Sequence, residues 1–567
     1  MKVTDYIIEF LISKGITDIF GYPGGVICHL MDSVTKYPGK IKARLNYHEQ
    51  AAAFAACGYA QETCGLGVAF ATSGPGATNL MTGIANAYFD SIPVIFLTGQ
   101  VDTYALKGEI PIRQCGFQET DIVSMAEPIT KYAVRVDDPT EIKRELEKAY
   151  NIATGSNPGP VVIDLPADVQ RADIELEKCM DYTAEAETET DYKAIAADLN
   201  EELQNASRPC LLIGNGVKQA GMVQDVKGLI KRLNIPAVFS MPAFDTLPYS
   251  DSLNFGFIGA NGHRYANFVL GKSDLIIVIG SRLDLKQVGS NRKDFAPQAR
   301  IIRIDIDAGN LAYHLRADEK QFCIDLRPLI KEWYAVSHKL PNDEWVKTCM
   351  EIKEKLQGYD DERYTELLCA FGKKIPKDTV ITVDVGQNQV WLAQQLQVKE
   401  GQTVHMSAGH GAMGYSLPAA IGCFYGTNRQ VFSFNGDGGI QMNLQELQFL
   451  AREQLPVKVV ILNNHSLGMI RGFQEANFER NYTQTTEGTG YSAPDFKKIA
   501  AAYGLEYIAV ASKKDLNKLL GLPEGPAVIE IQIQDSTVLN PNFGRNGQIQ
   551  DQRPYLDRTL FQELMDM

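Results

Sequence analysis

Short apolar runs alternate with longer amphipathic stretches along most of the chain. The runs that read as strands are Val68–Ala71, Val94–Thr98, Val161–Asp164, Leu211–Ile213, Leu275–Ile279, Val431–Phe434 and Val459–Leu462, and a helical stretch, Thr78–Tyr88, lies between the first two. Alternation of strand-sized and helix-sized segments is typical of parallel sheets covered by helices on both faces. The pattern therefore predicts an α/β protein built from doubly wound parallel sheets.

Two polar stretches interrupt this pattern. Residues 171–195 contain the acidic run Thr183–Asp191 and show no strand pattern, and residues 335–365 are helical in pattern and charged. Linkers favour such compositions. We therefore expect three domains, at residues 1–175, 190–335 and 360–535, followed by a C-terminal tail at 536–567.

Length and charge narrow the function classes. The chain has 567 residues, and 55 Lys+Arg against 69 Asp+Glu give a net charge of −14. A length of this size suggests about three to five domains. An acidic surface argues against binding to nucleic acid or to an anionic membrane, because both partners are polyanions. It does not exclude a small anion held by backbone amides and a metal ion.

The cysteines and the apolar runs indicate the cellular compartment in which the protein is expected. The ten cysteines are scattered without a Cys-x-x-Cys pair, so neither a zinc finger nor a disulfide framework is expected. Charge appears within the first five residues, and no apolar run approaches the roughly 20 residues of a membrane span. We expect a soluble, cytoplasmic protein with reduced thiols.

The most specific chemical signal lies in the third domain. Gly436-Asp437-Gly438 follows the strand 431–434, and Asn463-Asn464 closes the strand 459–462. Glycines let a backbone approach an anion, and a helix predicted at 443–450 would add N–H groups. Asp437 and Asn464 supply hard oxygen ligands suited to Mg²⁺, which would bridge to a diphosphate. A lone Gly-Asp-Gly is usually an ordinary turn. Gly-Asp-Gly together with Asn463-Asn464, each at the end of a strand, is a far more specific signal of such a site.

This pair resembles the cofactor motif of thiamine-diphosphate (ThDP) enzymes. The resemblance implies that Asp437, Asn464 and the Ser466 carbonyl hold the metal, that the Gly411 carbonyl contacts the aminopyrimidine, and that Met413 wedges the cofactor into a bent shape. Further cofactor contacts implied in the same way are Gly386, Gln387, Asn388, Gly436, Gly438 and Met469. Asn388 stands where relatives often have His.

The first domain resembles the pyrimidine-binding domain of the same enzymes. Glu49, in Tyr47-His48-Glu49-Gln50, would on general grounds be a helix-start dipole partner. The segments Gly21–Gly25 and Thr72–Asn79 around it change that interpretation. By resemblance Glu49 shares a proton with a cofactor ring nitrogen, and Pro23, Gly24 and Gly25 contact the cofactor. The resemblance also implies that Phe117 and Gln118 are catalytic residues at the donor site. In this family the two halves of a site come from different subunits, which implies a homodimer or homotetramer.

The middle domain carries glycine turns at strand ends. Its residues Gly214, Gly216, Gly259, Gly280, Arg282 and Asp305 stand in segments that resemble the FAD-binding domain of acetohydroxyacid synthases, a ThDP family that joins two 2-keto acids. The resemblance extends over most of the chain and implies FAD. The alternative is an inherited fold with an empty groove.

The expected acceptor pocket departs from that family. Phe473 stands where relatives have Trp, Lys286 where they have Arg, and Ala167 where they have Lys. Lys is a point charge and cannot reproduce the two-pronged Arg–carboxylate contact. An insertion at Gln100–Gln114 brings Arg113 near the donor-site residues. It is either a surface loop or a contact for a larger, phosphate-bearing acceptor.

Relatives from polysaccharide loci add a two-carbon unit from pyruvate to a nucleotide-linked keto sugar. They look similar at Phe473 and Gln474, which the resemblance places at the substrate, and in the tail segment Asn540–Arg545. That tail would form a lid. The sequence therefore predicts a ThDP- and Mg²⁺-dependent carboligase that decarboxylates pyruvate and adds the acetyl unit to a second carbonyl, with acetolactate as the default product. The alternatives are a branched-sugar product, a flavin-dependent pyruvate oxidase, and a cofactor-binding protein without activity.

Overall fold

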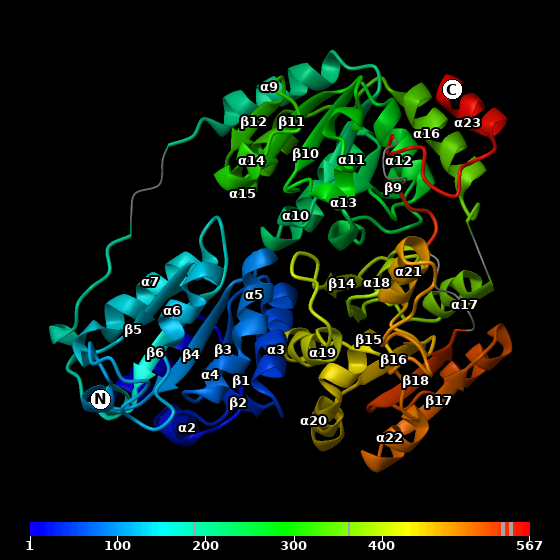
Figure 1. Cartoon of the computed structure of the whole chain (residues 1–567). Helices are drawn as coiled ribbons and strands as arrows, with labels where there is room; N and C mark the ends of the chain where they lie inside the picture. The colour runs from blue at the N-terminus through cyan, green and yellow to red at the C-terminus, as the bar shows by residue number, and fades with distance from the viewer. Residues whose placement is uncertain (185–188, 361–362, 534–538, 544–547) are drawn as a thin grey trace.

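The computed structural model describes the chain except residues 185–188, 361–362, 534–538 and 544–547. The described residues form three six-stranded sheets in which every neighbouring pair of strands is parallel. Figure 1 shows them as three bodies: the first in blue and cyan, the second in green above, and the third in yellow and orange. The predicted α/β class with three parallel-sheet domains is confirmed.

The first and third sheets share one topology. The first has the order β2-β1-β3-β4-β6-β5, and its strands are β1 (Asp18–Gly21), β2 (Lys42–Leu45), β3 (Gly67–Ala71), β4 (Val94–Gln100), β5 (Tyr132–Arg135) and β6 (Val161–Pro166). The third has the order β14-β13-β15-β16-β18-β17, and its strands are β13 (Val380–Val383), β14 (Thr403–Met406), β15 (Val431–Gly436), β16 (Val457–Asn463), β17 (Glu506–Val510) and β18 (Ala527–Gln532). In both sheets the order reverses beside the first strand, and ligands of doubly wound sheets bind at such a point.

The central sheet has the order β12-β11-β10-β7-β8-β9. Its strands are β7 (Pro209–Ile213), β8 (Ala237–Phe239), β9 (Asn254–Phe257), β10 (Leu275–Ile279), β11 (Arg300–Asp305) and β12 (Lys320–Cys323). Strand β10 is apolar and buried along its whole length, as expected for a parallel sheet that is covered on both faces.

Helices cover both faces of each sheet. Around the first sheet lie α1 (Val3–Ser13), α2 (Cys28–Thr35), α3 (Glu49–Thr63), α4 (Pro75–Asn79), α5 (Met81–Phe89) and α7 (Ile142–Thr154). Around the central sheet lie α9 (Tyr192–Gln204), α11 (Val223–Leu233), α12 (Arg264–Lys272), α13 (Leu285–Val288), α15 (Leu326–Val336) and α16 (Asp343–Leu356). Around the third lie α17 (Arg363–Gly372), α18 (Gln387–Gln395), α19 (Ser416–Thr427), α20 (Leu447–Glu453), α21 (Gly468–Asn477) and α22 (Phe496–Ala502).

Helices α3 and α19 join the first domain to the third (Figure 1). Small residues allow their backbones to touch: a Cβ on Gly58 would overlap the Ala419 carbonyl, and a Cβ on Gly422 would overlap the Ala55 carbonyl. The Ala-rich stretch that follows Glu49 is therefore buried packing surface rather than a solvent-facing helix.

One predicted helix is wrong in its start. The helix placed at 443–450 begins only at Leu447, after two short 3-10 turns, Gly439–Met442 and Leu444–Glu446. The side chain of Asn443 explains the delay, because its Nδ2 donates to the Gly414 carbonyl (2.8 Å) and holds Asn443 outside the α-helical region.

The described part of the C-terminal tail packs on the central domain. Helix α23 (Arg558–Asp566) lies beside α12 and α16 (Figure 1), and Leu556 and Leu564 join the buried cluster around Phe268. Residues Asn540–Phe543 of the predicted lid are described, whereas Gly544 and Arg545 lie outside the described residues.

Among the described residues, no helix combines the length and the apolar character that crossing a membrane requires.

Candidate active site

One large cavity is lined by residues of all three domains, the first domain contributing Phe89 and Asp90 among others. Its volume is about 1030 Å³. The predicted residues that line it are Gly386, Gln387, Asn388, Gly411, Met413, Gly436, Asp437, Gly438, Asn464, Ser466 and Met469 from the third domain, and Gly216, Gly280, Arg282, Lys286 and Asp305 from the central domain. The residues predicted from the two domains thus share one continuous space.

Three oxygen atoms converge in this cavity at the ends of β15 and β16. Asn464 Nδ2 donates to Gln387 Oε1 (2.9 Å), and in that orientation Asn464 Oδ1 faces the Ser466 carbonyl at 2.9 Å and Asp437 Oδ1 at 3.2 Å. Rotating the amide by 180° would place its nitrogen against these oxygens but would turn its oxygen toward Gln387 Oε1.

This cluster fits a magnesium ion. Adjacent ligands of an octahedral Mg²⁺, with bonds of 2.0–2.1 Å, lie about 2.9 Å apart; the Asn464–Ser466 oxygen separation equals this value at 2.9 Å, and the Asn464–Asp437 separation is close to it at 3.2 Å. Burial raises the pKa of Asp437 to about 6. A cation would favour the charged form of this carboxylate and give all three oxygens a partner.

Two helix N-termini face the same space. Helix α18 starts at Gln387 after Gly386, whose φ of +131° favours glycine, and α21 starts at Gly468, where a Cβ would overlap Gln387 Oε1. Asn388 donates to the Asp384 carbonyl (2.7 Å), and a Cβ on Gly436 would lie 3.2 Å from its Oδ1. Unpaired N–H groups at such helix starts suit a diphosphate.

The loop that carries Gly411 and Met413 is held at both ends by buried carboxylates. Asp90, at the end of α5, accepts from the N–H groups of Ala408 (3.0 Å) and Gly409 (2.7 Å). Asp384 accepts from the N–H groups of Gly414 (3.0 Å) and Tyr415 (3.2 Å). Sequence reasoning missed both residues, although Asp384 follows a strand directly and could have been suspected.

Burial raises the pKa of Asp384 to about 7 and that of Asp90 to about 6. Met413 extends from this loop toward the glycine turn, since a Cβ on Gly438 would lie 3.7 Å from Met413 Cε. The loop therefore has a fixed path beside the metal cluster.

Glu49 lies at the first residue of α3 and is 9% exposed. Its Oε2 accepts from Asn79 Nδ2 (2.9 Å), and a Cβ on Gly76 would lie 3.2 Å from its Oε1. Gln118, at φ +66°, packs against Gly74 in the same region, since a Cβ on Gly74 would lie 2.9 Å from Gln118 Cβ. Gly24 approaches the side chain of Thr72 so closely that a Cβ would overlap it.

These first-domain residues do not line the cavity of their own chain. Absent from its lining are Pro23, Gly24, Gly25, Glu49, Phe117 and Gln118, and also Arg113, Phe473, Gln474, Gly214 and Gly259. A single chain thus keeps the predicted pyrimidine half of the site apart from the metal half.

Some predicted residues have other contacts in the chain. Gln474 bonds the segment after α21, through Thr483 and Thr485. A Cβ on Gly214 would overlap Gly280, so the glycine at 214 is required by the close approach of two loops of the central sheet. Phe117 is 83% exposed and Phe473 is 57% exposed.

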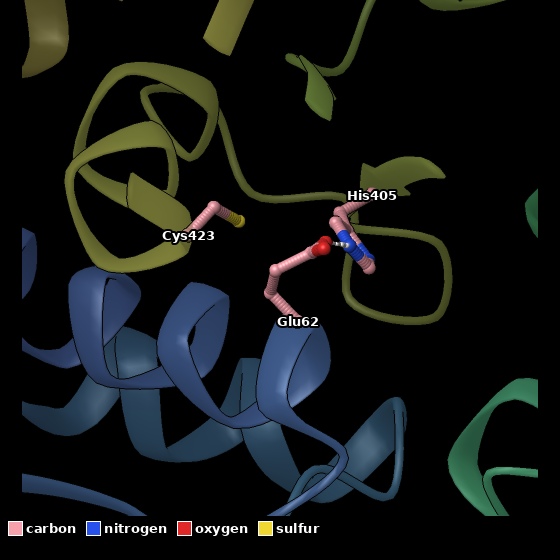
Figure 2. A group of neighbouring side chains, drawn as sticks. All are labelled: Glu62, His405 and Cys423. Carbon is pink, nitrogen blue, oxygen red and sulfur yellow. Dashed lines mark hydrogen bonds and ion pairs between the residues drawn. The ribbon is translucent and has the colours of Figure 1, made fainter. Parts of the chain in front are cut away.

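A second cluster has metal-ligand residue types but not the character of a metal site. Figure 2 shows Glu62 on α3 and His405 on β14 pointing toward one another, with Cys423 of α19 nearby. Glu62 Oε2 lies 2.5 Å from His405 Nε2, and Glu62 Oε1 pairs with Arg429. The Cys423 thiol donates to the Gly58 carbonyl (3.3 Å). The neighbouring guanidinium disfavours a cation, so this is an ion-pair network that ties the first domain to the third.

Comparison with known proteins agrees with this architecture. The N-terminal TPP binding domain, the central domain and the C-terminal TPP binding domain of thiamine pyrophosphate enzymes match residues 1–125, 196–332 and 384–531.

Relatives match over nearly the whole chain. An acetolactate synthase large subunit from Lactococcus lactis is 36% identical, covering 94% of this chain and 93% of the relative. The acetolactate synthase isozyme 2 large subunit of Escherichia coli is 34% identical, covering 94% and 96%. A probable acetolactate synthase large subunit from Methanocaldococcus jannaschii is 34% identical, covering 95% and 93%. The chain belongs to the thiamine pyrophosphate enzyme family, within the group that contains the acetolactate synthase large subunits.

Proposed function

We propose that this protein is a ThDP- and Mg²⁺-dependent carboligase that decarboxylates pyruvate and transfers the two-carbon unit to a second carbonyl, as in acetolactate synthesis. The observation that carries the proposal is the oxygen cluster of Asp437, Asn464 and Ser466 at the ends of β15 and β16, next to the switch point of the third sheet. The relatives named as acetolactate synthases, which align over nearly the full length, support the same reaction.

The third domain would hold the cofactor by its diphosphate. Asp437, Asn464 and the Ser466 carbonyl would bind Mg²⁺, and the N–H groups at the starts of α18 and α21 would bind the phosphate oxygens. When bound, thiamine diphosphate supplies a nucleophilic carbon and an electron sink for decarboxylation. Gly411 and Met413 would face its organic rings, on a loop whose path Asp90 and Asp384 fix.

Glu49 would exchange a proton with a ring nitrogen of the cofactor. Its carboxylate is buried and oriented by Asn79, which suits a general acid–base group. Because Glu49 does not line the cavity of its own chain, the active assembly proposed here is a homodimer or a larger homo-oligomer. In that assembly the first domain of one copy completes the site of another.

The central groove would hold FAD. Gly216, Gly280, Arg282 and Asp305 line the same cavity, and the glycines at 216 and 280 let the backbones of two loops approach each other closely. Flavin absorbance of the purified protein tests this part of the proposal. A colourless protein that takes up no added FAD would contradict it.

The central experiment is the substitution Glu49→Gln. We expect pyruvate consumption to fall by at least about 10²-fold, while thiamine diphosphate still binds in a calorimetric titration. Glu127→Gln is the matched control, because Glu127 is an exposed glutamate at a helix start of the same domain. Near-normal turnover of the Glu49 variant with cofactor bound would refute the assignment.

A branched-sugar product is the second candidate. The insertion before Phe117 is fixed rather than loose, since Glu119 accepts from the N–H groups of Lys107 (2.7 Å) and Cys115 (2.6 Å). This holds Arg113 exposed, where it could meet a phosphate-bearing acceptor. Product analysis with pyruvate alone and with added nucleotide-linked keto sugars separates the candidates, and fast acetolactate formation without sugar favours the first.

A further inference from the structure

The two carboxylate oxygens of Asp437 have different partners. Oδ1 faces the amide oxygen of Asn464 at 3.2 Å, whereas Oδ2 accepts from the Tyr491 hydroxyl at 2.7 Å. Asp437 is 2% exposed, so few other donors can reach it. A hydrogen bond to one oxygen of a carboxylate fixes the direction in which the other oxygen points.

Tyr491 is itself fixed relative to the oxygen cluster. A Cβ on Gly438 would lie 3.5 Å from the Tyr491 hydroxyl, so the phenol covers the glycine turn that follows Asp437. The Tyr491 N–H donates to the Thr486 carbonyl (3.3 Å), and Thr486 forms a β-bridge with Ser466. The residue that contacts Asp437 is therefore tied to the residue whose carbonyl completes the cluster.

Helix α21 holds this segment from its other side. Gln474 Nε2 donates to the Thr483 carbonyl (3.1 Å), and its Oε1 accepts from Thr485 Oγ1 (2.7 Å). Ser466 Oγ in turn donates to the Thr485 carbonyl (2.9 Å). The sequence interpretation placed Gln474 against substrate, but both ends of its amide are occupied by the segment that leads to Tyr491.

We propose that Tyr491 is a positioning residue of the metal centre, which orients Asp437 for Mg²⁺ from outside the ligand shell. This inference rests on the metal site of the proposed function and adds a residue to it. A phenol suits the role because it is a neutral donor: it fixes the carboxylate without cancelling the negative charge that binds the cation. Partners of this kind commonly contribute 10–100-fold in metal affinity.

The test is Tyr491→Phe, which removes one hydroxyl and keeps the ring. Mg²⁺ is titrated calorimetrically into the full-length protein with saturating thiamine diphosphate, and we expect affinity for Mg²⁺ to fall by roughly 10–100-fold. Turnover should return toward the wild-type value at saturating Mg²⁺, because the ligands themselves remain. The melting temperature of the metal-free protein should not change.

Tyr482→Phe is the matched control. Tyr482 lies on the same segment and its hydroxyl also donates to a carboxylate, Glu475 Oε1 (2.6 Å), but that carboxylate is not in the oxygen cluster. We expect the control to bind Mg²⁺ as the wild type does. Equal losses in both variants would overturn the proposal, because they would point to a general effect on the segment.

Two further outcomes would also overturn it. Wild-type Mg²⁺ affinity in Tyr491→Phe would show that the hydroxyl has no positioning role, and a lower melting temperature of the metal-free variant would assign Tyr491 a structural role instead. Asp437→Ala separates this failure from that of the proposed function. If Asp437→Ala still binds Mg²⁺ normally, the metal site is wrong; if it loses Mg²⁺ while Tyr491→Phe does not, only the role of Tyr491 is wrong.

Discussion

Glu446 is a buried carboxylate whose replacement by Gln should stabilise the protein at neutral and alkaline pH. It is fully buried; its Oε1 accepts from the Tyr47 N–H (2.7 Å) and its Oε2 from Asn46 Nδ2 (3.0 Å). Burial raises the pKa of Glu446 from its ordinary 4.5 to about 7. Asn46 Oδ1 has no hydrogen-bond partner, so a rotation of the Asn46 amide would present an acceptor to the new Gln Nε2.

The sign and the size of this stabilisation follow from proton linkage. Between about pH 4.5 and 7 the folded state binds more protons at Glu446 than the unfolded state does, so the free energy of unfolding falls as pH rises through this window. The pKa difference corresponds to an upper limit of roughly 3 kcal/mol above pH 7. Gln cannot ionise, so the variant avoids this loss of stability above pH 4.5. Below about pH 4.5 the variant and the wild type should have equal free energies of unfolding.

The assay is the difference in melting temperature between Glu446→Gln and wild type at several pH values from 5 to 8, since other titrating groups cancel in that difference. At about 2.1 cal/mol/K per residue, 3 kcal/mol corresponds to roughly 3 °C if the whole chain unfolds together and roughly 8 °C if a domain of about 180 residues unfolds alone. A difference that stays constant with pH, or a variant less stable than wild type at pH 8, would refute the reasoning.

Two further predictions concern packing and the tail. Gly422→Ala should lower the melting temperature measurably, because the new methyl group meets the Ala55 carbonyl between α3 and α19. The control Gly521→Ala should leave the melting temperature unchanged, because nothing lies within 4 Å of its new Cβ. Equal melting temperatures of the two variants would contradict the packing argument. Gln552→Ala should weaken FAD binding, measured by flavin fluorescence, because Gln552 Nε2 donates to three carbonyls of the Gly259–Gly262 turn (3.0–3.3 Å). Unchanged FAD affinity would show that this turn does not support the proposed flavin site.

Periodicity predicted the sheets well because buried parallel strands are nearly continuous apolar runs. The strand predicted at Leu275–Ile279 has these same bounds in the structure, and the strand predicted at 431–434 ends two residues later, at Gly436. The helix expected at 443–450 failed for a reason that local pattern cannot contain. Asn443 bonds Gly414, 29 residues earlier, and Gln50, in another domain. Side chains that bond across domains override local propensity.

The site residues divide in the same way. Asp437 and Asn464, the proposed magnesium ligands, could be named from the sequence because strand ends and glycine turns leave a pattern. Asp90 and Tyr491 were missed because nothing near them in the chain marks them: Asp90 reaches the N–H of Gly409 across 319 residues, and Tyr491 reaches Asp437 across 54. Residues that orient a site from outside it are defined by a contact in space and not by a motif.

Residue types alone would also rank the two candidate metal clusters wrongly. Glu62, His405 and Cys423 include the better transition-metal ligands, but each Glu62 oxygen already faces a donor, and one of those donors is the Arg429 guanidinium. In the other cluster, within the part of the chain that the structure describes, the Asn464 oxygen faces only acceptors. A cation is attracted where oxygens meet without a hydrogen between them, and it is repelled where a fixed positive charge already pairs with the carboxylate. On that physical ground we place the proposed magnesium site at Asp437, and the Glu62 cluster belongs to the packing of the first domain against the third.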